Sequence, residues 1–358
     1  MKFGYTQFMV ESIKPPEDQN RTRKDDHIRI NIEEDVQSHS EGGFDLYYFE
    51  HNAMPEIDFK EVDTSTSIFQ KSIRAPLLIS SMTGGTKKGI EINRRLACAA
   101  ENFGIAMGVG SQRVDIEAGF FSEESNIRNF APNIPVFANI GAIQLNYGMT
   151  ISNCRKAIDL IRADALILHL NPLQEVLQPE GQTNFAGLLK KIKNICKELQ
   201  IPVIVKEVGW GISSTLAGKL IDAGVSCIDV AGAGGTSWAL VEKFRNQDPI
   251  RVKMSDNFKD WGIPTAFCLE EIHTKYPHFP LISSGGLRNG IDAAKSIALG
   301  AVMAGFAGPL LRAAVVSQEK LNLLLARIID ELKVVMFVTG AKDIPKLSKV
   351  PLRYPRYF

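Results

Sequence analysis

The stretch DALILHLNPLQEVLQPEG, residues 164–181, joins a short apolar run to a dense group of polar side chains. The apolar run 165–168 is typical of a strand buried in a parallel sheet. The polar group that follows brings an imidazole, two amides and a carboxylate: His169, Asn171, Gln174 and Glu175. Pro172 and Pro179 restrict the backbone, so we expect a stiff loop. This composition favours the edge of an active site, with an ordinary surface loop as the alternative.

Apolar runs of the same kind recur along the chain, and each ends in small or polar residues. The predicted strands are residues 77–79, 105–107, 136–138, 165–168, 203–205, 227–230, 281–283 and 301–303. Apolar residues at helical spacing between these runs predict helices at residues 90–102, 185–199, 289–299 and 319–338. Alternation of eight strands with helices predicts an α/β protein, a (β/α)8 TIM barrel. An open, doubly wound sheet is the alternative fold.

The barrel pattern leaves a segment at each end of the chain and one insertion. We divide the chain into an N-terminal arm with a mixed region, the barrel and a C-terminal tail: residues 1–75, 76–340 and 341–358. Residues 14–20 are polar and contain two prolines, which indicates flexible chain, and residues 36–75 are expected on the outside of the barrel. Residues 242–264 are an insertion after the sixth strand. The tail is expected to pack over the barrel or a neighbouring subunit.

The composition describes a protein with a substantial core, since 45% of its 358 residues are hydrophobic and 23% are charged. The net charge of +1 argues against a general nucleic-acid or membrane-surface binder. The sequence contains no run of about 18 apolar residues and no signal-peptide core, so we expect a cytoplasmic protein. The cysteines lack C-x-x-C spacing, which favours reduced, buried thiols over zinc ligands: Cys98, Cys154, Cys196, Cys227 and Cys268.

Glycine-rich turns follow the last strands of the predicted barrel, and in this fold the active site lies at the carboxyl ends of the strands. The turn SGGLR, 284–288, and the pair Ala304–Gly305 let backbone N–H groups approach a phosphate beside the helix that starts near Asn289. Tight strand-to-helix turns are the simpler explanation. The glycine-rich stretch 232–238 lacks the spacing and the acidic partner of a dinucleotide fingerprint, so we reject that motif.

Charged side chains at the same end of the barrel and on the arm are further candidates. Lys206 directly follows the fifth strand and is expected to point into the barrel mouth, where its charge suits a cofactor or a phosphate. Glu175 is the best candidate for a Mg2+ ligand, because Mg2+ takes only one or two carboxylates beside substrate phosphates. A solvated loop carboxylate is the alternative. A basic cluster on the arm either suits phosphate oxygens or is simply solvated: Arg21, Arg23, Lys24 and His27.

Seven motifs together make the chain resemble the type 2 isopentenyl-diphosphate isomerases, which are FMN-dependent flavoenzymes with a (β/α)8 barrel. The motifs are RKDDH (23–27), SSMTGG (80–85), GVGSQR (108–113), LNPLQEVLQPEG (170–181), KEVGWG (206–211), GGTSW (234–238) and SGGLR (284–288). The likeness runs from Arg23 to about Leu311, and the motif at 170–181 is the most specific of the seven.

The resemblance implies an isomerase of isoprenoid precursor biosynthesis. Members of the family interconvert isopentenyl and dimethylallyl diphosphate without net redox change, using Mg2+ and FMN that NADPH reduces. The resemblance further implies that residues 76–340 bind FMN and that the substrate is a small diphosphate. It also implies no nucleic-acid or membrane partner, and a homotetramer or homo-octamer.

The same resemblance assigns expected roles to individual residues. FMN is expected to contact Ser81, Met82, Thr83, Ser111, Asn139, Lys206 and Thr236, with its phosphate on Gly285, Gly286, Arg288, Ala304 and Gly305. The substrate is expected to contact Arg23, Lys24, His27, Ser111, Arg113 and Gln174. Glu175 is the expected Mg2+ ligand. The expected catalytic residues are Gln174, His169, Asn171 and, lining the alkenyl pocket, Trp238.

Two other functions are compatible with a flavin-binding barrel. A 2-hydroxy-acid oxidase would need a proton-abstracting histidine after the seventh strand, where this sequence has Ser-Ser-Gly-Gly at 283–286. A non-catalytic flavin sensor would need the cofactor grip but not the basic cluster that suits a diphosphate. Both alternatives explain fewer of the motifs than the isomerase prediction does.

Overall fold

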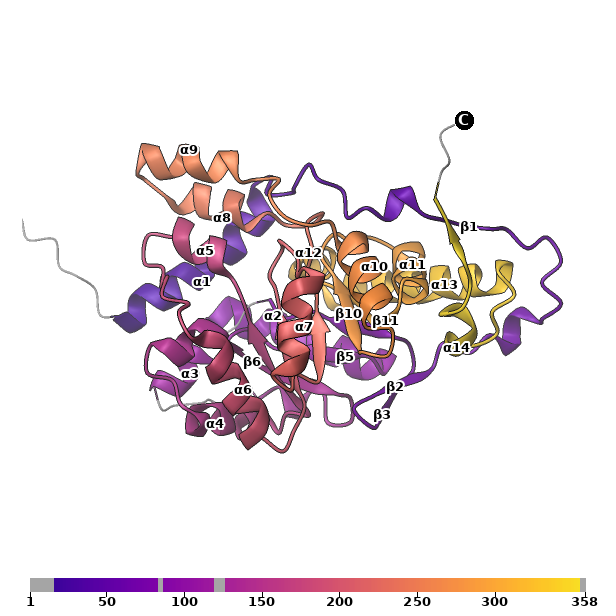
Figure 1. Cartoon of the computed structure of the whole chain (residues 1–358), viewed down its shortest axis with the longest axis horizontal. Helices are drawn as coiled ribbons and strands as arrows, with labels where there is room; N and C mark the ends of the chain where they lie inside the picture. Colours follow the sequence, from indigo (N-terminus) through magenta and orange to yellow (C-terminus); the bar gives the residue numbers. More distant parts are fainter. Residues whose placement is uncertain (1–15, 83–85, 119–125, 355–358) are drawn as a thin grey trace, which may run out of the picture.

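Eight parallel strands form a closed barrel in the computed structural model (Figure 1). The structure describes residues 16–82, 86–118 and 126–354, and it leaves out the side chains of residues 16–22 and 87. The strands are β4 (Leu77–Ile79), β5 (Ala106–Gly108), β6 (Val136–Gly141), β7 (Ala165–His169), β8 (Val203–Lys206), β9 (Cys227–Asp229), β10 (Leu281–Ser284) and β11 (Ala301–Phe306). Their side chains are almost all buried, because the barrel interior and the outer helices cover both faces of the sheet. The pairing of β11 with β4 closes the barrel, so the (β/α)8 prediction is confirmed and the open sheet is excluded.

Helices follow the strands and surround the barrel (Figure 1). They are α2 (Lys87–Phe103), α3 (Arg113–Ala118), α4 (Ile151–Ile161), α6 (Leu188–Glu198), α7 (Ser214–Asp222), α10 (Thr265–Lys275), α11 (Gly290–Ala298), α12 (Gly308–Val316) and α13 (Gln318–Val338). The four helices predicted from apolar spacing are confirmed as α2, α6, α11 and α13. The side chain of Asn289 accepts a hydrogen bond from the N–H of Asp292 and so caps the start of α11.

The N-terminal arm is helical. α1 spans Pro16–Glu33, so the prediction of flexible chain at residues 14–20 is wrong for the described part of that stretch. The sequence of α1 is mostly polar, but Ile28 and Ile30 are almost fully buried. Packing against the inserted segment after β9 therefore stabilises this helix more than its own sequence does, and the buried cluster contains Ile30, Val36, Leu240 and Val241.

Residues 36–75 do not all lie on the outside of the barrel. They form η1 (Phe44–Leu46), β1 (Tyr48–Phe49), η2 (Phe59–Glu61), β2 (Thr66–Ile68) and β3 (Lys71–Ile73). Ile68 and Ile73 of the β2–β3 hairpin share a core with the inward-facing residues at the amino ends of the strands. Phe69 contacts Phe137 edge to face, with ring centroids 5.9 Å apart. The prediction is therefore wrong for the hairpin, whose apolar side chains plug the amino end of the barrel.

A buried ion pair lies at the amino end of the barrel. Arg128, on η4 (Ile127–Asn129), places Nη2 2.6 Å from Oδ2 of Asp164. All three guanidinium nitrogens donate hydrogen bonds, and the other acceptors are the carbonyls of Ala131, Ile134, Ile161 and Arg162. Lys71 of the hairpin lies 2.6 Å from Oδ1 of Asp164. Each charged group here has its partners within the protein.

The predicted loop after β7 and the insertion after β9 both contain helices. α5 spans Pro172–Leu177, so residues expected in a stiff loop lie on a short helix that begins at a proline. The insertion forms α8 (Trp238–Arg245) and α9 (Pro249–Asn257). α1, α5 and α9 all pack against α8 (Figure 1). These four helices stand over the carboxyl ends of the strands.

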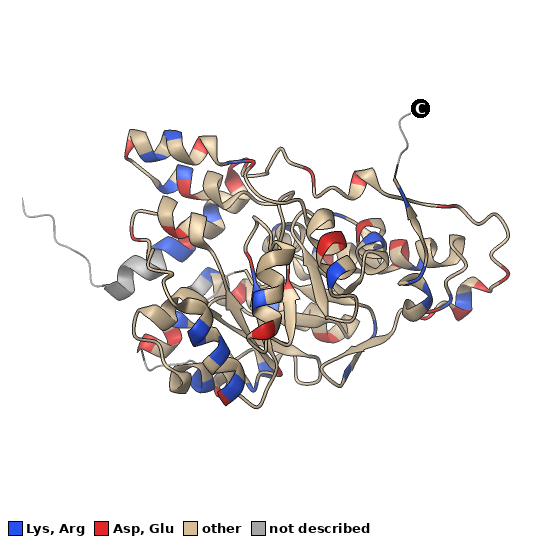
Figure 2. Cartoon of the chain, in the orientation of Figure 1, with Lys and Arg blue, Asp and Glu red and all other residues tan. Residues whose placement is uncertain are grey.

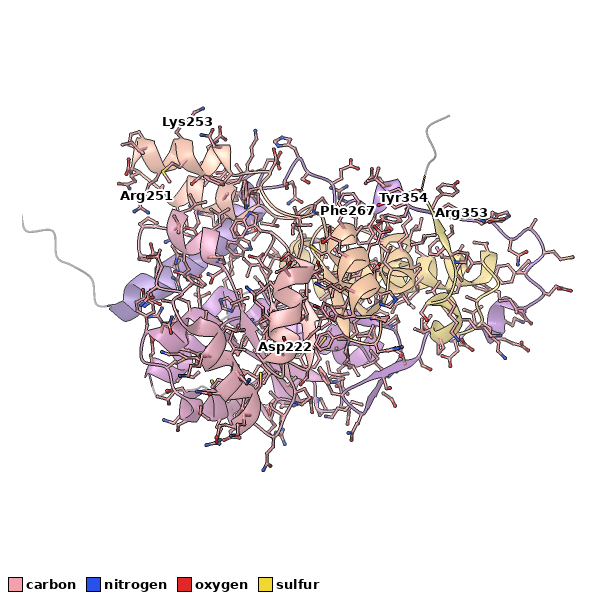
Figure 3. The ribbon with its side chains drawn as sticks, in the orientation of Figure 1. Asp222, Arg251, Lys253, Phe267, Arg353 and Tyr354 are labelled. Carbon is pink, nitrogen blue, oxygen red and sulfur yellow. The ribbon has the colours of Figure 1, made fainter. Side chains whose placement is uncertain are left out.

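Backbone hydrogen bonds tie the segment after α1 to the loop before α8. The N–H of Ser38 donates to the carbonyl of Gly235 at 2.8 Å, and the N–H of Ser237 donates to the carbonyl of Val36 at 2.7 Å. The C-terminal tail forms α14 (Ile344–Leu347) and β12 (Leu352–Arg353), which pairs with β1 near the labelled Arg353 in Figure 3. The tail thus packs on its own chain.

Acidic and basic residues alternate along the outer helices in Figure 2, and their numbers nearly balance at a net charge of +1. Among the residues that the structure describes, no helix is long and apolar enough to cross a membrane.

Candidate active site

A cavity of about 430 Å3 lies at the carboxyl ends of the strands, against α1, α5 and α8. The residues expected in the site line this cavity as follows: Arg23, Lys24, His27, Ser81, Met82, Ser111, Arg113, Asn139, His169, Asn171, Gln174, Glu175, Lys206, Thr236, Trp238, Gly285, Gly286, Arg288 and Gly305. Ala304 does not line it, because it is buried in β11 and its N–H already donates to the carbonyl of Pro76. Thr83 lies outside the described residues.

Side chains from β9 and β10 fix Lys206 at the floor of the cavity. Its Nζ lies 2.9 Å from Oδ2 of Asp229 and donates to Oγ of Ser284, also at 2.9 Å. Ser284 Oγ donates in turn to Oδ1 of Asp229 at 2.6 Å. All three side chains are buried, so the carboxylate of Asp229 compensates the lysine charge and holds it in one position.

His169, at the end of β7, is held as a neutral imidazole. Its Nδ1 lies 2.8 Å from Oδ1 of Asn139, whose Nδ2 donates to the carbonyl of Val109. This orientation of the amide makes Nδ1–H the donor and leaves Nε2 as an acceptor. Burial lowers the pKa of His169 to about 4, and the positive charges of Lys206 and Arg23 act in the same direction.

The polar side chains of α5 form one hydrogen-bonded chain along the cavity wall. Nδ2 of Asn171 donates to Oε1 of Gln174 at 3.1 Å and to Oε1 of Glu175 at 3.0 Å. Nε2 of Gln174 donates to Oε1 of Glu242, on α8, at 3.1 Å. Asn171, Gln174 and Glu175 are all buried, which rules out the solvated-carboxylate explanation for Glu175.

α1 brings its basic side chains over the same wall. His27 Nε2 lies 3.0 Å from Oε1 of Glu242, and its ring meets Trp238 edge on, with centroids 5.0 Å apart. Nζ of Lys24 donates to the carbonyl of Ser111 at 3.1 Å. Burial lowers the pKa of Arg23, while the nearby carboxylates of Glu180, Glu175 and Glu242 oppose that shift. The arm therefore places two long cations and an imidazole beside the residues of α5.

Two curated proteins are similar in sequence to this chain over most of its length. A curated isopentenyl-diphosphate delta-isomerase from Nostoc sp. is 51% identical over 92% of this chain and 95% of its own length. Another, from Rickettsia africae, is 48% identical over 92% of this chain and 97% of its own length. The chain belongs to the isopentenyl-diphosphate delta-isomerase family. Residues 169–353 also match the sequence profile of the FMN-dependent dehydrogenases, so this is the type 2, FMN-dependent branch that the motifs resemble.

Solved structures with the same fold extend the comparison beyond the isomerase family. A Pediococcus acidilactici lactate oxidase superposes with a TM-score of 0.63 at 18% identity, covering 95% of this chain and 94% of the oxidase. A flavocytochrome b2 variant superposes with a TM-score of 0.66 at 18% identity, covering 96% and 89%. At this identity the likeness establishes the barrel fold alone.

Groups in the cavity fit the flavin that this FMN-dependent family implies. The Oγ atoms of Ser80 and Ser81 are buried and have no hydrogen-bond partner within the described part of the chain. Gly285 and Gly286 have φ angles of 98° and 82°. A Cβ at either position would collide with the backbone of the 232–234 loop. The unpartnered hydroxyls after β4 and the glycine cradle after β10 suit the polar edge and the phosphate of FMN.

Four charged residues next to the cavity were given no role from the sequence, and α8 carries two of them. Glu242 is fully buried and lies four residues after Trp238, so both project from one face of α8. Burial alone would raise the pKa of Glu242, but hydrogen bonds from His27 and Gln174 and the charges of His27 and Arg245 lower it to about 2. Nη1 of Arg245 lies 2.6 Å from Oε2 of Glu242. The helical spacing of these residues was the available signal, and it requires knowing that the insertion is a helix.

The other two missed residues are Asp229 and Glu207. Asp229 is the last residue of β9, a buried acid in an apolar run, and it was visible in the sequence as such. Oε2 of Glu207 accepts hydrogen bonds from three consecutive N–H groups, those of residues 208–210, at 2.6, 2.7 and 2.6 Å. Burial raises the pKa of Glu207 to about 7. The carboxylate fixes the loop whose Gly209 lies against Thr236 and Trp238.

Proposed function

We propose that this chain interconverts isopentenyl diphosphate and dimethylallyl diphosphate, with reduced FMN and one Mg2+ ion bound in the cavity. The observation that carries the proposal is that three groups line one cavity: the basic side chains of α1, the carboxylate of Glu175 and the glycine cradle after β10. The names of the relatives support the same reaction. A hydroxy-acid oxidase is less consistent with the site, because it would need a histidine after β10, where this chain has glycines, whereas His169 lies at the end of β7.

In this proposal the diphosphate binds between α1 and α5. Arg23 and Lys24 supply positive charge from a helix that stands over the cavity, and His27 lines the same wall. Glu175 would offer a carboxylate oxygen to Mg2+, and the ion would also take phosphate oxygens of the substrate as ligands. Fixing the diphosphate at one end orients the alkene at the other end against the cavity floor and Trp238.

Moving the double bond requires the addition of a proton at one carbon and the removal of a different proton from another carbon. With a pKa of about 4, His169 carries almost no imidazolium near pH 7, and Glu242, with a pKa of about 2, is ionised and cannot donate a proton. Reduced FMN, when bound, supplies an acid and a base at its N5 edge. Lys206 would place a positive charge beside the flavin, and Gln174, which Asn171 and Glu242 hold in place, would lie next to the reacting carbons.

The covering helices exclude water from this chemistry in our proposal. α1 and the α8–α9 insertion close over the bound diphosphate and protect a carbocation-like species from solvent. Because of this closure, substrate with Mg2+ should slow protease cleavage within both segments, and cleavage at an unchanged rate would contradict the closure.

NADPH would supply the electrons that reduce FMN before the isomerisation begins.

Proton NMR with isopentenyl diphosphate, FMN, Mg2+ and NADPH under anaerobic conditions tests the reaction directly. We expect dimethylallyl diphosphate to appear, and to be absent when FMN stays oxidised. Gln174→Ala should lower kcat by roughly 10²–10³-fold without weakening FMN binding. Gln318→Ala, on α13 and outside the cavity lining, is the matched control and should keep the wild-type rate. A reducible, bound flavin with no conversion would overturn the substrate assignment.

A further inference from the structure

We infer that Gln178 sets the metal preference of the site. Together with the backbone N–H of Gln182, its side chain restricts Glu175 to one available oxygen, which favours Mg2+ over Ca2+. This inference rests on the proposed function, since it takes Glu175 as the Mg2+ ligand. It concerns a residue outside the set assigned to substrate, flavin or metal above, although Gln178 lines the same cavity and is buried.

The chain reverses direction directly after α5 and so brings both donors onto one carboxylate oxygen. Gln178 ends the helix, with its N–H donating to the carbonyl of Gln174 at 2.9 Å. The N–H of Gly181 then returns to the carbonyl of Gln178 at 3.3 Å. A Cβ on Gly181 would collide with the carbonyl of Glu175, so this turn needs glycine. Arg251 of α9, labelled in Figure 3, donates to the carbonyl of Gln178 at 3.3 Å and supports the turn from outside.

The two oxygens of Glu175 accept different numbers of hydrogen bonds. Oε2 accepts from Nε2 of Gln178 and from the N–H of Gln182, each at 2.6 Å. Oε1 accepts one hydrogen bond, from Nδ2 of Asn171 at 3.0 Å. A carboxylate has about four lone-pair positions, two on each oxygen. Within the described part of the chain, Oε2 is therefore saturated and Oε1 keeps one position for a further partner.

A carboxylate with one open position binds a cation through one oxygen. Mg2+ accepts this, because it binds few carboxylates, keeps several waters and needs octahedral geometry at about 2.0–2.1 Å. Ca2+ is larger, takes six to eight oxygens and often binds a carboxylate through both of them. The donors on Oε2 deny Ca2+ the second oxygen, whereas they cost Mg2+ nothing and keep its ligand in place.

Competition between metals tests the inference on FMN-loaded protein with micromolar inorganic pyrophosphate. Electron paramagnetic resonance of Mn2+ reports bound and free metal, and added Mg2+ or Ca2+ displaces it. Gln178→Met keeps the volume of the side chain but removes its N–H donor. We expect the preference for Mg2+ over Ca2+ to fall by about 10-fold in this variant, with the Kd of FMN unchanged, since such supporting hydrogen bonds change metal affinity by about 10–100-fold.

Gln318→Met is the matched control, because it makes the same side-chain change on α13, outside the cavity lining. It should keep the wild-type ratio of Mg2+ to Ca2+ affinity. Gln178→Asn, which is too short to reach Oε2, is the second variant if Gln178→Met folds poorly, and it should repeat the loss. An unchanged ratio in a folded Gln178 variant, or an equal loss in Gln318→Met, would overturn the inference. Mn2+ binding that is no weaker in Glu175→Gln than in wild type would instead overturn the metal site of the proposed function.

Discussion

The two ends of the barrel both hold buried charges, but they differ in how completely the protein satisfies its own polar groups. At the amino end, all three guanidinium nitrogens of Arg128 donate, and Asp164 receives Lys71 as a second cation. At the carboxyl end, the hydroxyls of Ser80 and Ser81 and Oδ1 of Asn171 lack partners within the described part of the chain. Unmet polar groups of this kind are costly when buried. The complete network of hydrogen bonds and ion pairs at the amino end stabilises the fold. The incomplete network at the carboxyl end leaves polar groups available to a ligand.

Arg128→Met gives the largest effect that we expect, and it should fall on stability. The change removes one partner of a buried ion pair and its hydrogen bonds to four carbonyls, and we expect a cost of about 3–5 kcal/mol in the free energy of unfolding although Lys71 still pairs with Asp164. Urea unfolding of the FMN-loaded protein measures this change. FMN affinity and kcat of the folded fraction should stay at wild-type values.

Arg155→Met is the control for that prediction, since the side chain of Arg155 is 55% exposed and should change the free energy of unfolding by less than about 0.5 kcal/mol. If Arg128→Met instead weakened FMN binding and left stability intact, the two ends of the barrel would not be separable in this way.

The pH dependence of stability should reveal His169 at the other end. The pKa of His169 is about 4 in the folded protein and near 6.5 in the unfolded chain. Between these values the unfolded chain binds a proton that the folded protein does not, so stability rises with pH through this window. The contribution of His169 to the free energy of unfolding is complete above pH 6.5. It is lost as the pH falls toward 4, by up to about 3 kcal/mol.

His169→Gln should flatten the dependence of the unfolding midpoint on pH between 4 and 6.5, and His27, whose pKa burial also lowers, should account for part of the slope that remains. The exposed His51 serves as control, and His51→Gln should leave the slope as it is. A slope that His169→Gln does not reduce would show that the imidazole titrates normally in the folded protein.

Ser81→Ala gives the smallest expected effect and contrasts most directly with Arg128→Met. Its buried hydroxyl has no partner in the described residues, so the variant without FMN should be as stable as wild type or more stable by up to about 1 kcal/mol. The Kd of FMN should rise by roughly 5–10-fold, because one hydrogen bond to the flavin is lost. Fluorescence titration of FMN measures the change, and a stability loss without a change in Kd would place Ser81 among the structural residues.

The sequence predicts the barrel well, because each strand is a short apolar run and each run ends where the polar motif begins. The strand from Ala165 and the helix capped by Asn289 are local features of this kind. α1 could not be predicted, because its mostly polar residues are stabilised as a helix by contacts with α8, α2 and α3. The plugging role of the β2–β3 hairpin was hidden for the same reason, since Ile68 and Ile73 look like ordinary strand residues.

Among the site residues, the motifs indicated those at the carboxyl ends of strands, such as His169 and Lys206. They did not locate Glu242 or Gln178 as functional partners, because their importance lies in the atoms they contact rather than in their place after a strand. Glu175 was expected as a metal ligand, but nothing in the sequence indicates that one of its oxygens is already saturated.

The hydrogen bonds that join residues 36–38 to residues 235–237 also constrain the order in which the chain can fold. During synthesis the arm emerges first, and its partners emerge roughly 200 residues later, so this contact has a high sequence separation and forms late. Until then the nascent barrel has no cover over its mouth. We therefore expect the cavity of a growing chain to stay uncovered until translation has passed residue 237, so that tight cofactor retention requires a chain longer than this.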